Sequence, residues 1–529
     1  MISELIRQAE EGRPIWLPDL RQSFASLPSS LPVRIRLSGG AYGTRDFSLS
    51  FPTAGNEEER EFLLRYCCAS VYNLLSAYSA EEVALYADGP AAELLQAVPA
   101  RFEKESGFRK VMNIAGRIYG ALHFRIESLD SYRPAPLSSA APSVDLQERL
   151  LAMIRQSEEK GCVGVDVGGS DIKLAVSCRG KLLYTEEYDW NPAASPTAEG
   201  ILDPILALVK TAKERIEQSG GSLDAVGISF PDVVIGDRIL GGETPKTKGM
   251  RENASLDYER EFSKLGALRD QILPLCAPGA SVRITNDGNM AAFTAAVELA
   301  AGESGDAIRR GVIAHSLGTD LGTGWLKADG TIPAIPLELY DLLLDLGSLP
   351  AAALPPEDLR STRNENSGMP GVRRYLGQAA AYRLAHRLDP AMLDGFTRLE
   401  GALLTVPTRP QDLRKPCLAN LMQLAETGKP EAEEIFRRIG RNLSVVARET
   451  AWLFTETPQQ RFLFGRFVKS RRCFELLCEG FDEAGTAVRL LAADEELANS
   501  PLMKQLAAAP GVTVAQFAQA VGSVYFAFA

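Results

Sequence analysis

The sequence predicts an α/β chain of two lobes preceded by a smaller α+β domain, and three observations lead to this fold class. Residues 163–173 are a short apolar run that ends in Gly168-Gly169-Ser170 before extended residues resume. Residues 311–330 repeat that order of strand, glycine-rich turn and strand. A stretch rich in Pro, Ser and Ala at 133–143 cannot hold a regular element, so it separates the two lobes from what precedes them.

The first 132 residues carry both strand and helix patterns and no motif for chemistry. Alternating or helical spacing of apolar residues predicts strands at 33–37, 47–51, 83–86 and 118–126 and a helix at 57–78. The segment lacks a basic recognition helix, which disfavours DNA binding. Packing against the lobes, lining the site and mediating a homodimer stay open for it.

After the linker we expect a first lobe over 144–295 and a second over 296–529. A helix at 144–160 leads into a β-β-β-α-β order, with strands at 161–167, 172–177, 182–188 and 224–229 and a helix at 198–217. The second lobe should hold helices at 373–388, 430–457 and 470–484, a late strand at 512–515 and a terminal helix through Phe526. Closure of the two lobes on each other would exclude water from bound phosphates.

The turn at 168–170 has the chemistry of a phosphate cradle. Gly168 and Gly169 let backbone N–H groups approach an anion, Ser170 adds a donor, and Asp166 can hold Mg²⁺ through water. A plain β-hairpin turn explains the same residues, since Gly-Gly is ordinary turn chemistry.

Two further motifs follow in an order that a phosphotransferase could use. Asn286 and Asp287 end a strand before an alanine-rich helix, and Gly318, Thr319 and Gly322 lie in the second glycine-rich turn. Phosphoryl transfer is mostly positioning and charge neutralisation, so it needs turns for the nucleotide phosphates and one base for the acceptor hydroxyl. Asp287 is the candidate base, and a helix N-cap is its structural alternative. Asn286 and Asn289 add polar groups that could hold a polyol.

These motifs together resemble the ROK family of bacterial sugar kinases and repressors, over residues 160 to 529. The resemblance implies a two-lobed actin-like ATPase fold, of the ribonuclease H-like type. It also implies that Asp287 is the general base, with Asn286 beside it in acceptor binding, and that Gly465 lies against adenosine. The implied contacts to ATP phosphates come from Asp166, Gly168, Gly169, Ser170, Lys173, Gly318, Thr319 and Gly322.

Several positions depart from the family pattern. The family's zinc-binding His and Cys residues should fall between 345 and 372, where the sequence has neither residue type, so no zinc is expected, and Ser348 replaces a ligand. Lys246 and Arg373 stand where neutral or acidic groups would bind the sugar. We predict that both bind substrate, and that they suit a carboxylated or phosphorylated one. The alternative is that they are solvated loop residues.

Three polar residues near the motifs leave alternatives open. Asp320 occupies a glycine position of the second phosphate turn, so either it faces away or it approaches Mg²⁺ through water. His315 lies on an apolar strand and is expected to be a core histidine. Asp232 follows the strand at 224–229, where capping a turn is favoured over touching substrate.

Composition agrees with a globular enzyme and excludes some partners. The net charge of −11 argues against nucleic acid, because counterion release requires clustered Lys and Arg. No signal peptide or membrane-spanning apolar run is visible, so a cytoplasmic location and no membrane partner are expected. The sequence therefore predicts an ATP- and Mg²⁺-dependent kinase of a sugar-like alcohol. The alternative is a non-catalytic sensor of sugar or nucleotide that has lost turnover.

Overall fold

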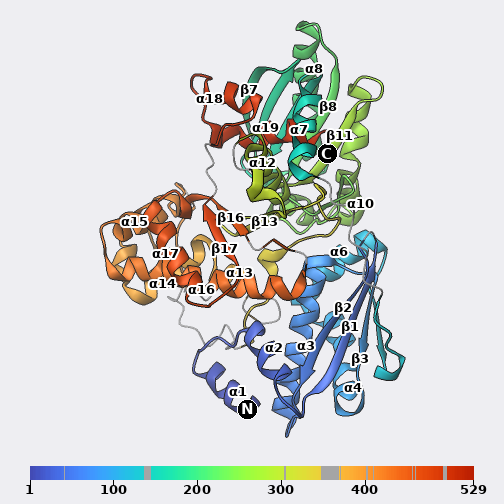
Figure 1. Cartoon of the computed structure of the whole chain (residues 1–529), viewed down its shortest axis with the longest axis vertical. Helices are drawn as coiled ribbons and strands as arrows, with labels where there is room; N and C mark the ends of the chain where they lie inside the picture. Colours follow the sequence, from blue (N-terminus) through green and yellow to red (C-terminus); the bar gives the residue numbers. More distant parts are fainter. Residues whose placement is uncertain are drawn as a thin grey trace.

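A computed structural model describes residues 1–40, 42–135, 145–302, 305–346, 369, 371–400, 403–408, 410–455, 457–458, 460–492 and 497–529. The molecule is elongated, with the first lobe at one end and the N-terminal domain at the other (Figure 1). The second lobe lies beside the middle of this long axis. No helix in these ranges is long and apolar enough to cross a lipid bilayer.

The N-terminal domain is a four-stranded sheet with helices packed around it. The sheet has the order β2-β1-β3-β4, with bounds Gly43–Phe51, Leu31–Gly39, Glu82–Tyr86 and His123–Glu127. Its helices are α1 (Ile2–Glu10), α2 (Leu17–Ala25), α3 (Glu57–Tyr78), α4 (Gly89–Leu95), α5 (Val98–Lys104) and α6 (Arg109–Tyr119).

Helix α3 has the predicted bounds because its start is well specified. The Asn56 side chain accepts a hydrogen bond from the Glu59 N–H, and three glutamates in the first turn suit the positive end of the helix dipole. The predicted strand at 118–126 was wrong in its first part. Helix α6 continues to Tyr119 and ends at Gly120, whose φ of +89° favours glycine, so β4 starts only at His123.

The first lobe is built on a five-stranded sheet of order β11-β8-β5-β6-β7. Strand β5 (Gly161–Val167) pairs antiparallel with β6 (Asp171–Cys178), which pairs antiparallel with β7 (Lys181–Asp189). On its other side β5 is parallel to β8 (Leu223–Phe230), which is parallel to β11 (Ser281–Asn286). Helices α7 (Leu146–Ser157) and α8 (Glu199–Gln218) complete the predicted β-β-β-α-β order.

The second lobe repeats this scheme with a four-stranded sheet of order β13-β12-β16-β17. Strand β12 (Gly311–Leu317) is antiparallel to β13 (Leu321–Lys327) and parallel to β16 (Gln460–Phe464), and β16 is parallel to β17 (Arg489–Ala492). In both lobes a hairpin strand lies at the centre and two parallel strands extend the sheet away from the hairpin. The predicted two-lobed α/β fold is confirmed.

The helices of the second lobe are α13 (Val372–Tyr375), α14 (Gly377–Leu388), α15 (Arg414–Glu426), α16 (Pro430–Leu453) and α17 (Arg471–Asp482). Two of them, α16 and α17, agree with the prediction except at their ends, and α15 was not predicted. The predicted single helix at 373–388 is broken at Leu376, which is extended, with a φ of −131° and a ψ of 168°.

The C-terminal segment returns to the first lobe. Helix α19 (Val514–Phe526) packs on β5, β6 and β8, and α18 (Pro501–Ala507) packs on β7, although residues 296–529 were assigned to the second lobe. The predicted strand at 512–515 was wrong, because Thr513 caps α19 by accepting a hydrogen bond from the Gln516 N–H.

The N-terminal domain and the second lobe share one hydrophobic core. A buried polar network also joins them: Arg21 pairs with Glu449 of α16 at 2.8 Å, and the Asn73 amide donates to the same carboxylate and to the Leu343 carbonyl, both at 2.8 Å. Of the roles left open for the first 132 residues, packing against a lobe is what the structure shows.

Candidate functional site

Parallel pairing brings the first two predicted motifs to one edge of the first sheet. In the register of β5, β8 and β11, Asp166 is opposite Ser229, and Ser229 is opposite Thr285. The turn after β5 and Asp287 after β11 therefore lie two strands apart, about 10 Å by the usual strand spacing. Carboxyl ends of parallel strands are the usual place for ligands in open α/β sheets.

Lys246 connects this edge to the second lobe. Its Cε lies 3.5 Å from the position that a Cβ would take on Gly169, so the side chain reaches the turn after β5. Burial raises the pKa of Asp287 and of Asp320, and the charge of the same ammonium group partly opposes that rise in both. The three stretches that carry the predicted motifs thus all lie within reach of the charge of one lysine, which has no ion-pair partner among the described residues.

The turn at 168–170 is held by its own backbone. The Gly168 N–H donates to the Asp171 carbonyl at 2.8 Å, and Trp190 donates from Nε1 to the Gly168 carbonyl at 3.2 Å. Ser170 Oγ lies 2.9 Å from Asp171 Oδ2, and Lys173 pairs with the same aspartate. Gly169 and Ser170 are exposed, as groups that receive a ligand must be.

Asp287 is the first residue of α12 (Asp287–Ala301) and has a raised pKa. Burial raises it, while Lys246 and the Gly288 N–H, which donates to Oδ1 at 2.8 Å, act in the opposite direction. The helix N-cap is Asn286, whose Oδ1 accepts from the same N–H at 2.9 Å. Capping by Asn286 leaves the Asp287 carboxylate available for chemistry.

The two asparagines beside Asp287 are engaged in structure. Asn286 Nδ2 donates to the Asp232 carbonyl at 2.9 Å, so both ends of its amide bond to backbone. Asn289 is buried, and its Oδ1 accepts from the Trp325 N–H of β13 at 3.0 Å. Their described contacts fix the start of α12 against both lobes, and acceptor binding by Asn286 stays a prediction.

Asp166 near the end of β5 has the environment of a metal-associated carboxylate. Burial raises its pKa to about 6, the neighbouring Ser229 hydroxyl and Lys173 lower it, and Asp287 adds repulsion. A divalent cation would relieve this repulsion, and Mg²⁺ usually uses one or two carboxylates, several waters and substrate phosphates. The described residues contain no group of three or more His, Cys, Asp or Glu side chains that could hold a metal on their own.

The second turn, at 318–320, joins β12 to β13 at the corresponding edge of the second sheet. A Cβ on Gly318 would meet nothing within 4 Å, so this glycine faces open space. Gly322 follows on β13, where a Cβ would lie 3.5 Å from that of Ser316. Gln378 at the start of α14 donates its N–H to the Gly318 carbonyl at 2.9 Å, so the helix N-terminus braces the turn that carries Thr319.

Gly465 directly follows β16 and packs closely against the end of β12. Its φ is +97°, and a Cβ there would lie 2.4 Å from the Leu317 carbonyl oxygen. Both the backbone conformation and the approach require glycine. The structure therefore puts the predicted adenosine-binding residue beside the second turn.

Arg373 and Asp320 lie on the second lobe's side of the site, near enough for their charges to affect each other. Arg373 pairs with Asp341 at 3.0 Å and lies over the Tyr340 ring at 4.5 Å. Burial raises the pKa of Asp320, while Arg373, Lys246 and Lys110 lower it. Asp320 therefore lies within electrostatic reach of three cationic side chains, and its orientation and its approach to Mg²⁺ stay predictions.

Four residues that the sequence analysis missed complete the second lobe's side of the site. Glu338, Tyr340 and Asp341 lie in the segment after β13, and Lys110 reaches them from α6, 228 to 231 positions earlier in the chain. Glu338 raises the pKa of both Asp287 and Asp232, which shows that its carboxylate lies near the candidate base. The signal available in the sequence was the pair of acids, Glu338 and Asp341, around Tyr340. The composition of this segment is otherwise ordinary, so the signal did not stand out.

Two secondary predictions are confirmed. His315 is buried, its Nδ1 lies 2.9 Å from Thr323 Oγ1, and burial lowers its pKa to about 3, as expected of a neutral core histidine. Asp232 holds a turn: its carboxylate accepts from the Val233 N–H at 2.7 Å and from the Gly242 N–H at 3.0 Å. Ser348 and most of the span from 345 to 372 lie outside the described residues.

The turn held by Asp232 predicts a pH dependence of stability. Burial raises the pKa of Asp232 to about 6, so the folded protein binds a proton more tightly than the unfolded chain. The stabilisation that comes from the protonated Asp232 carboxyl group is therefore present at low pH and is lost as the pH rises through 6. Relative to an Asp232→Asn variant, whose amide oxygen still accepts both N–H bonds, the wild-type free energy of unfolding should fall by about 2 kcal/mol between about pH 4.5 and 7.5. Urea unfolding of both proteins at both pH values measures this change. A difference in free energy of unfolding between wild type and variant that is the same at the two pH values contradicts the prediction.

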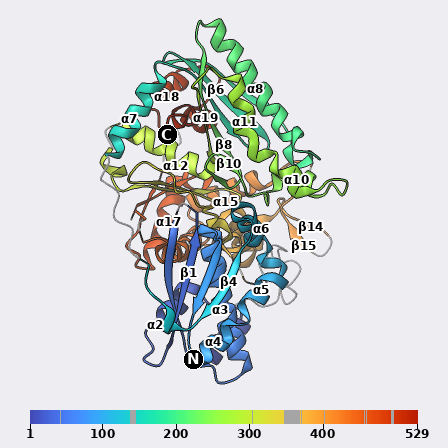
Figure 2. The same cartoon turned by 90° about the vertical axis from the view of Figure 1, so that its right-hand side faces the viewer.

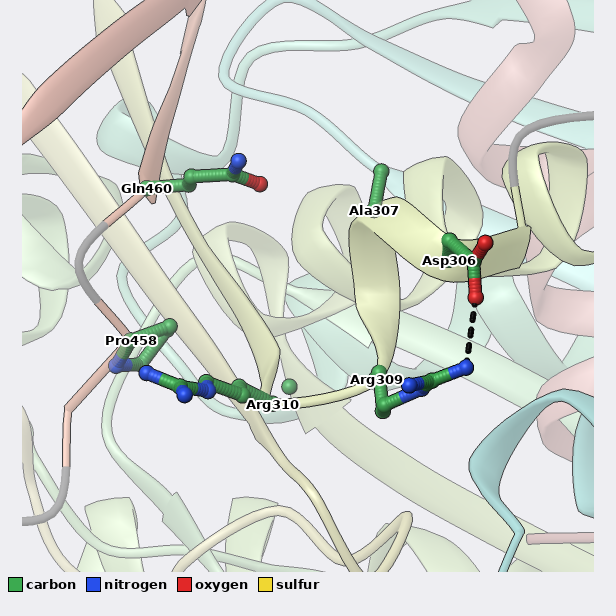
Figure 3. Close-up of a pocket in the computed structure, with 7 residues that line it drawn as sticks. Asp306, Ala307, Arg309, Arg310, Pro458 and Gln460 are labelled. Carbon is green, nitrogen blue, oxygen red and sulfur yellow. Dashed lines mark hydrogen bonds and ion pairs between the residues drawn. The ribbon is translucent and has the colours of Figure 1, made fainter.

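A surface hollow at the opposite edge of the second sheet is separate from this site. It lies at the starts of β12 and β16, with a volume of about 360 Å³, and contains the Asp306–Arg309 ion pair at 2.7 Å (Figure 3). The glycine turn follows the other end of β12. The hollow therefore cannot contribute to the candidate site.

Comparisons with known proteins give structural similarities only. No family model matches the chain, and no curated protein matches it. The chain is similar to a ROK family glucokinase from Streptomyces griseus in complex with glucose and AMPPNP, with 22% identity over 69% of this chain and 98% of that one and a TM-score of 0.40. It is also similar to a ROK hexokinase from Thermus thermophilus, with 18% identity over 69% of this chain and 97% of that one and a TM-score of 0.42.

A third similar structure is a regulator rather than a kinase. It is a ROK family transcriptional regulator, a homologue of the E. coli MLC protein, with 13% identity over 70% of this chain and 81% of that one and a TM-score of 0.43. The fold assignment of the present chain rests on the strand order of its two sheets.

Proposed function

We propose that this protein is an ATP- and Mg²⁺-dependent phosphotransferase that acts on a hydroxyl group of a sugar-like molecule. The observation that carries the proposal is the meeting of three segments around Lys246: the turn at 168–170, Asp287, and the turn that ends at Asp320. Two glycine turns with exposed residues beside a half-buried carboxylate supply what phosphoryl transfer needs, namely anion binding and one base.

In this mechanism Asp287 is the general base. As the acceptor oxygen bonds to the terminal phosphorus and the bond from that phosphorus to the leaving ADP oxygen breaks, the acceptor proton passes to the Asp287 carboxylate. Backbone N–H groups at 168–170 and at 318–319 would hold the phosphates, and Lys246 would neutralise charge on the group in transfer. Asp166 would hold Mg²⁺ through water, and the ion supplies charge neutralisation when bound.

Charge balance on the acceptor side favours an uncharged acceptor. The prediction of an anionic substrate rested on Lys246 and Arg373, but Arg373 pairs with Asp341 and Lys110 pairs with Glu338 and Asp341. The positive charges of Arg373 and Lys110 are thus neutralised by the carboxylates of Glu338 and Asp341. Of these three cations, Lys246 is the one with no ion pair among the described residues, and its side chain reaches the phosphate turn. Glu338 near Asp287 could accept hydrogen bonds from sugar hydroxyls.

A coupled assay of ADP release with Mg²⁺ tests the proposal. The acceptors are neutral hexoses, hexosamines, sugar acids and sugar phosphates. We expect turnover with a neutral sugar and none without acceptor. Turnover of only sugar acids or sugar phosphates would reject the uncharged acceptor. Binding of sugar and nucleotide without turnover would support the sensor, a function favoured by the carboxylate of Asp320 at a phosphate turn.

A further inference from the structure

Helix α6 of the N-terminal domain carries a polar stripe. Lys110, Asn113 and Arg117 are spaced by three and four residues, so their side chains project from one face of the helix. Val111 and Ile114 are buried. The helix lies at the end of the N-terminal domain that is next to the first lobe (Figures 1 and 2).

The first residue of the stripe contacts the second lobe. Lys110 Nζ lies 2.7 Å from Glu338 Oε2, also contacts Asp341 and the Tyr340 hydroxyl, and lies 4.4 Å from the centre of the Tyr340 ring. These three contacts use all the donors of the ammonium group. Burial alone would lower the pKa of Lys110, but Asp341 and Glu338 raise it well above its ordinary value, so the charge is permanent.

The other two residues contact the first lobe. Asn113 Nδ2 and Arg117 Nη2 both lie 3.1 Å from Glu243 Oε1. Arg117 also pairs with Glu259 at 2.7 Å and donates to the Gly241 carbonyl. Its side chain is only 9% exposed, so the contacts with Glu243 and Gly241 are largely shielded from water and from salt, whereas Glu259 is exposed.

The two contacted segments are those that carry the acceptor side of the site. Residues 241–251 carry Lys246, and residues 337–341 carry Glu338. The second segment is strained: Leu337 has a φ of +55°, which a leucine rarely adopts. The N-terminal domain holds it there, because the N–H groups of Leu337 and Glu338 donate to the Ala77 and Ser76 carbonyls of α3, both at 3.0 Å.

We propose that the N-terminal domain is a structural part of the acceptor site. In this inference the stripe on α6 fixes residues 241–251 and 337–341 relative to each other, and Lys110 is a positioning residue that orients the Glu338 carboxylate. The kinetic consequence rests on the proposed function, whereas the positioning of the two segments does not.

Hydrogen exchange of the full chain tests the positioning without any substrate. Amides in 337–341 should exchange about tenfold faster or more in a Lys110→Met variant, since removing one partner of a buried ion pair is strongly destabilising. Amides in 241–251 should respond in the same way to Arg117→Met. The matched control is Arg109→Met, an exposed residue on the same helix, which should leave both segments unchanged. Unaltered exchange in both segments of both variants overturns the inference.

Steady-state kinetics then test the role of Lys110, with the neutral sugar that gives the highest turnover as the probe. Lys110→Met should raise the KM for that sugar about tenfold or more while the KM for ATP stays within about twofold. If Lys110 acts through Glu338, the Lys110→Met/Glu338→Gln double variant should have the same sugar KM as Glu338→Gln. Lys110→Arg should restore part of the affinity.

The two proposals fail in different ways. A wild-type protein without turnover on any sugar rejects the kinase, while the exchange measurement still decides the role of α6. Wild-type turnover combined with an unchanged sugar KM in Lys110→Met rejects the positioning role of Lys110. A double variant whose sugar KM rises by the product of the two single fold changes also rejects it, because independent effects mean that Lys110 does not act through Glu338.

Discussion

Phosphoryl transfer by an Asp287→Asn variant should fall by about 10²–10⁴-fold, the usual contribution of a general base. Asparagine keeps the size of the side chain and an oxygen that can accept the Gly288 N–H, but it cannot take the proton of the acceptor hydroxyl. Asn286 remains as the helix cap, so α12 should start where it does now. The rate of initial ADP release at saturating sugar and ATP measures the effect.

The pH profile gives a second readout of the same variant. Burial raises the pKa of Asp287, so wild-type kcat/KM should rise with pH through that pKa, because only the ionised carboxylate accepts a proton. This acid limb should be missing in the variant. Asp306→Asn, an exposed aspartate at the far edge of the second sheet, is the control and should behave as wild type. An Asp287→Asn rate within twofold of wild type would remove Asp287 as the base.

Replacing Gly227 with alanine should destabilise the first lobe by about 3 kcal/mol or more. Gly227 lies in β8 beneath α19, where an added Cβ would be 1.8 Å from the Ser523 carbonyl oxygen. Gly164 of β5 has the same relation to the Ala520 carbonyl, at 1.9 Å. Backbone atoms cannot rotate away as a side chain would, so the whole helix must move off the sheet.

Urea unfolding followed by circular dichroism measures this loss. Gly116→Ala is the matched control, because a Cβ at Gly116 would meet nothing within 4 Å and alanine is favoured in a helix by about 1 kcal/mol. The control should be as stable as wild type or more so. A Gly227→Ala protein of wild-type stability would mean that α19 does not lie against the sheet as the structure has it.

Local signals in the sequence account for what was predicted well. The strand ends at 167 and 286 and the bounds of α3 follow from apolar periodicity, glycine turns and a capping residue, all of which act over a few positions. Strand order then brought Asp287 to the edge that carries the turn at 168–170, because parallel strands share their carboxyl ends.

The missed part of the site depends on contacts between distant segments. Glu338 matters because Lys110 meets it from 228 positions away, and no periodicity at either residue indicates this pairing. The conformation of Leu337 is likewise fixed by carbonyls of α3 and not by its own residue type. Arg373 was predicted to bind substrate, but it pairs with Asp341, which lies in the same missed segment.

The position of α19 has a consequence for synthesis on the ribosome. The glycine-lined face of β5 and β8 stays uncovered until residues 514–526 have emerged, more than 280 positions after β8 is complete. Domains generally fold as they leave the exit tunnel, N-terminal ones first. The lobe that carries Asp166 and Asp287 must therefore wait for α19, and a nascent chain stalled before it would expose an apolar sheet that chaperones bind.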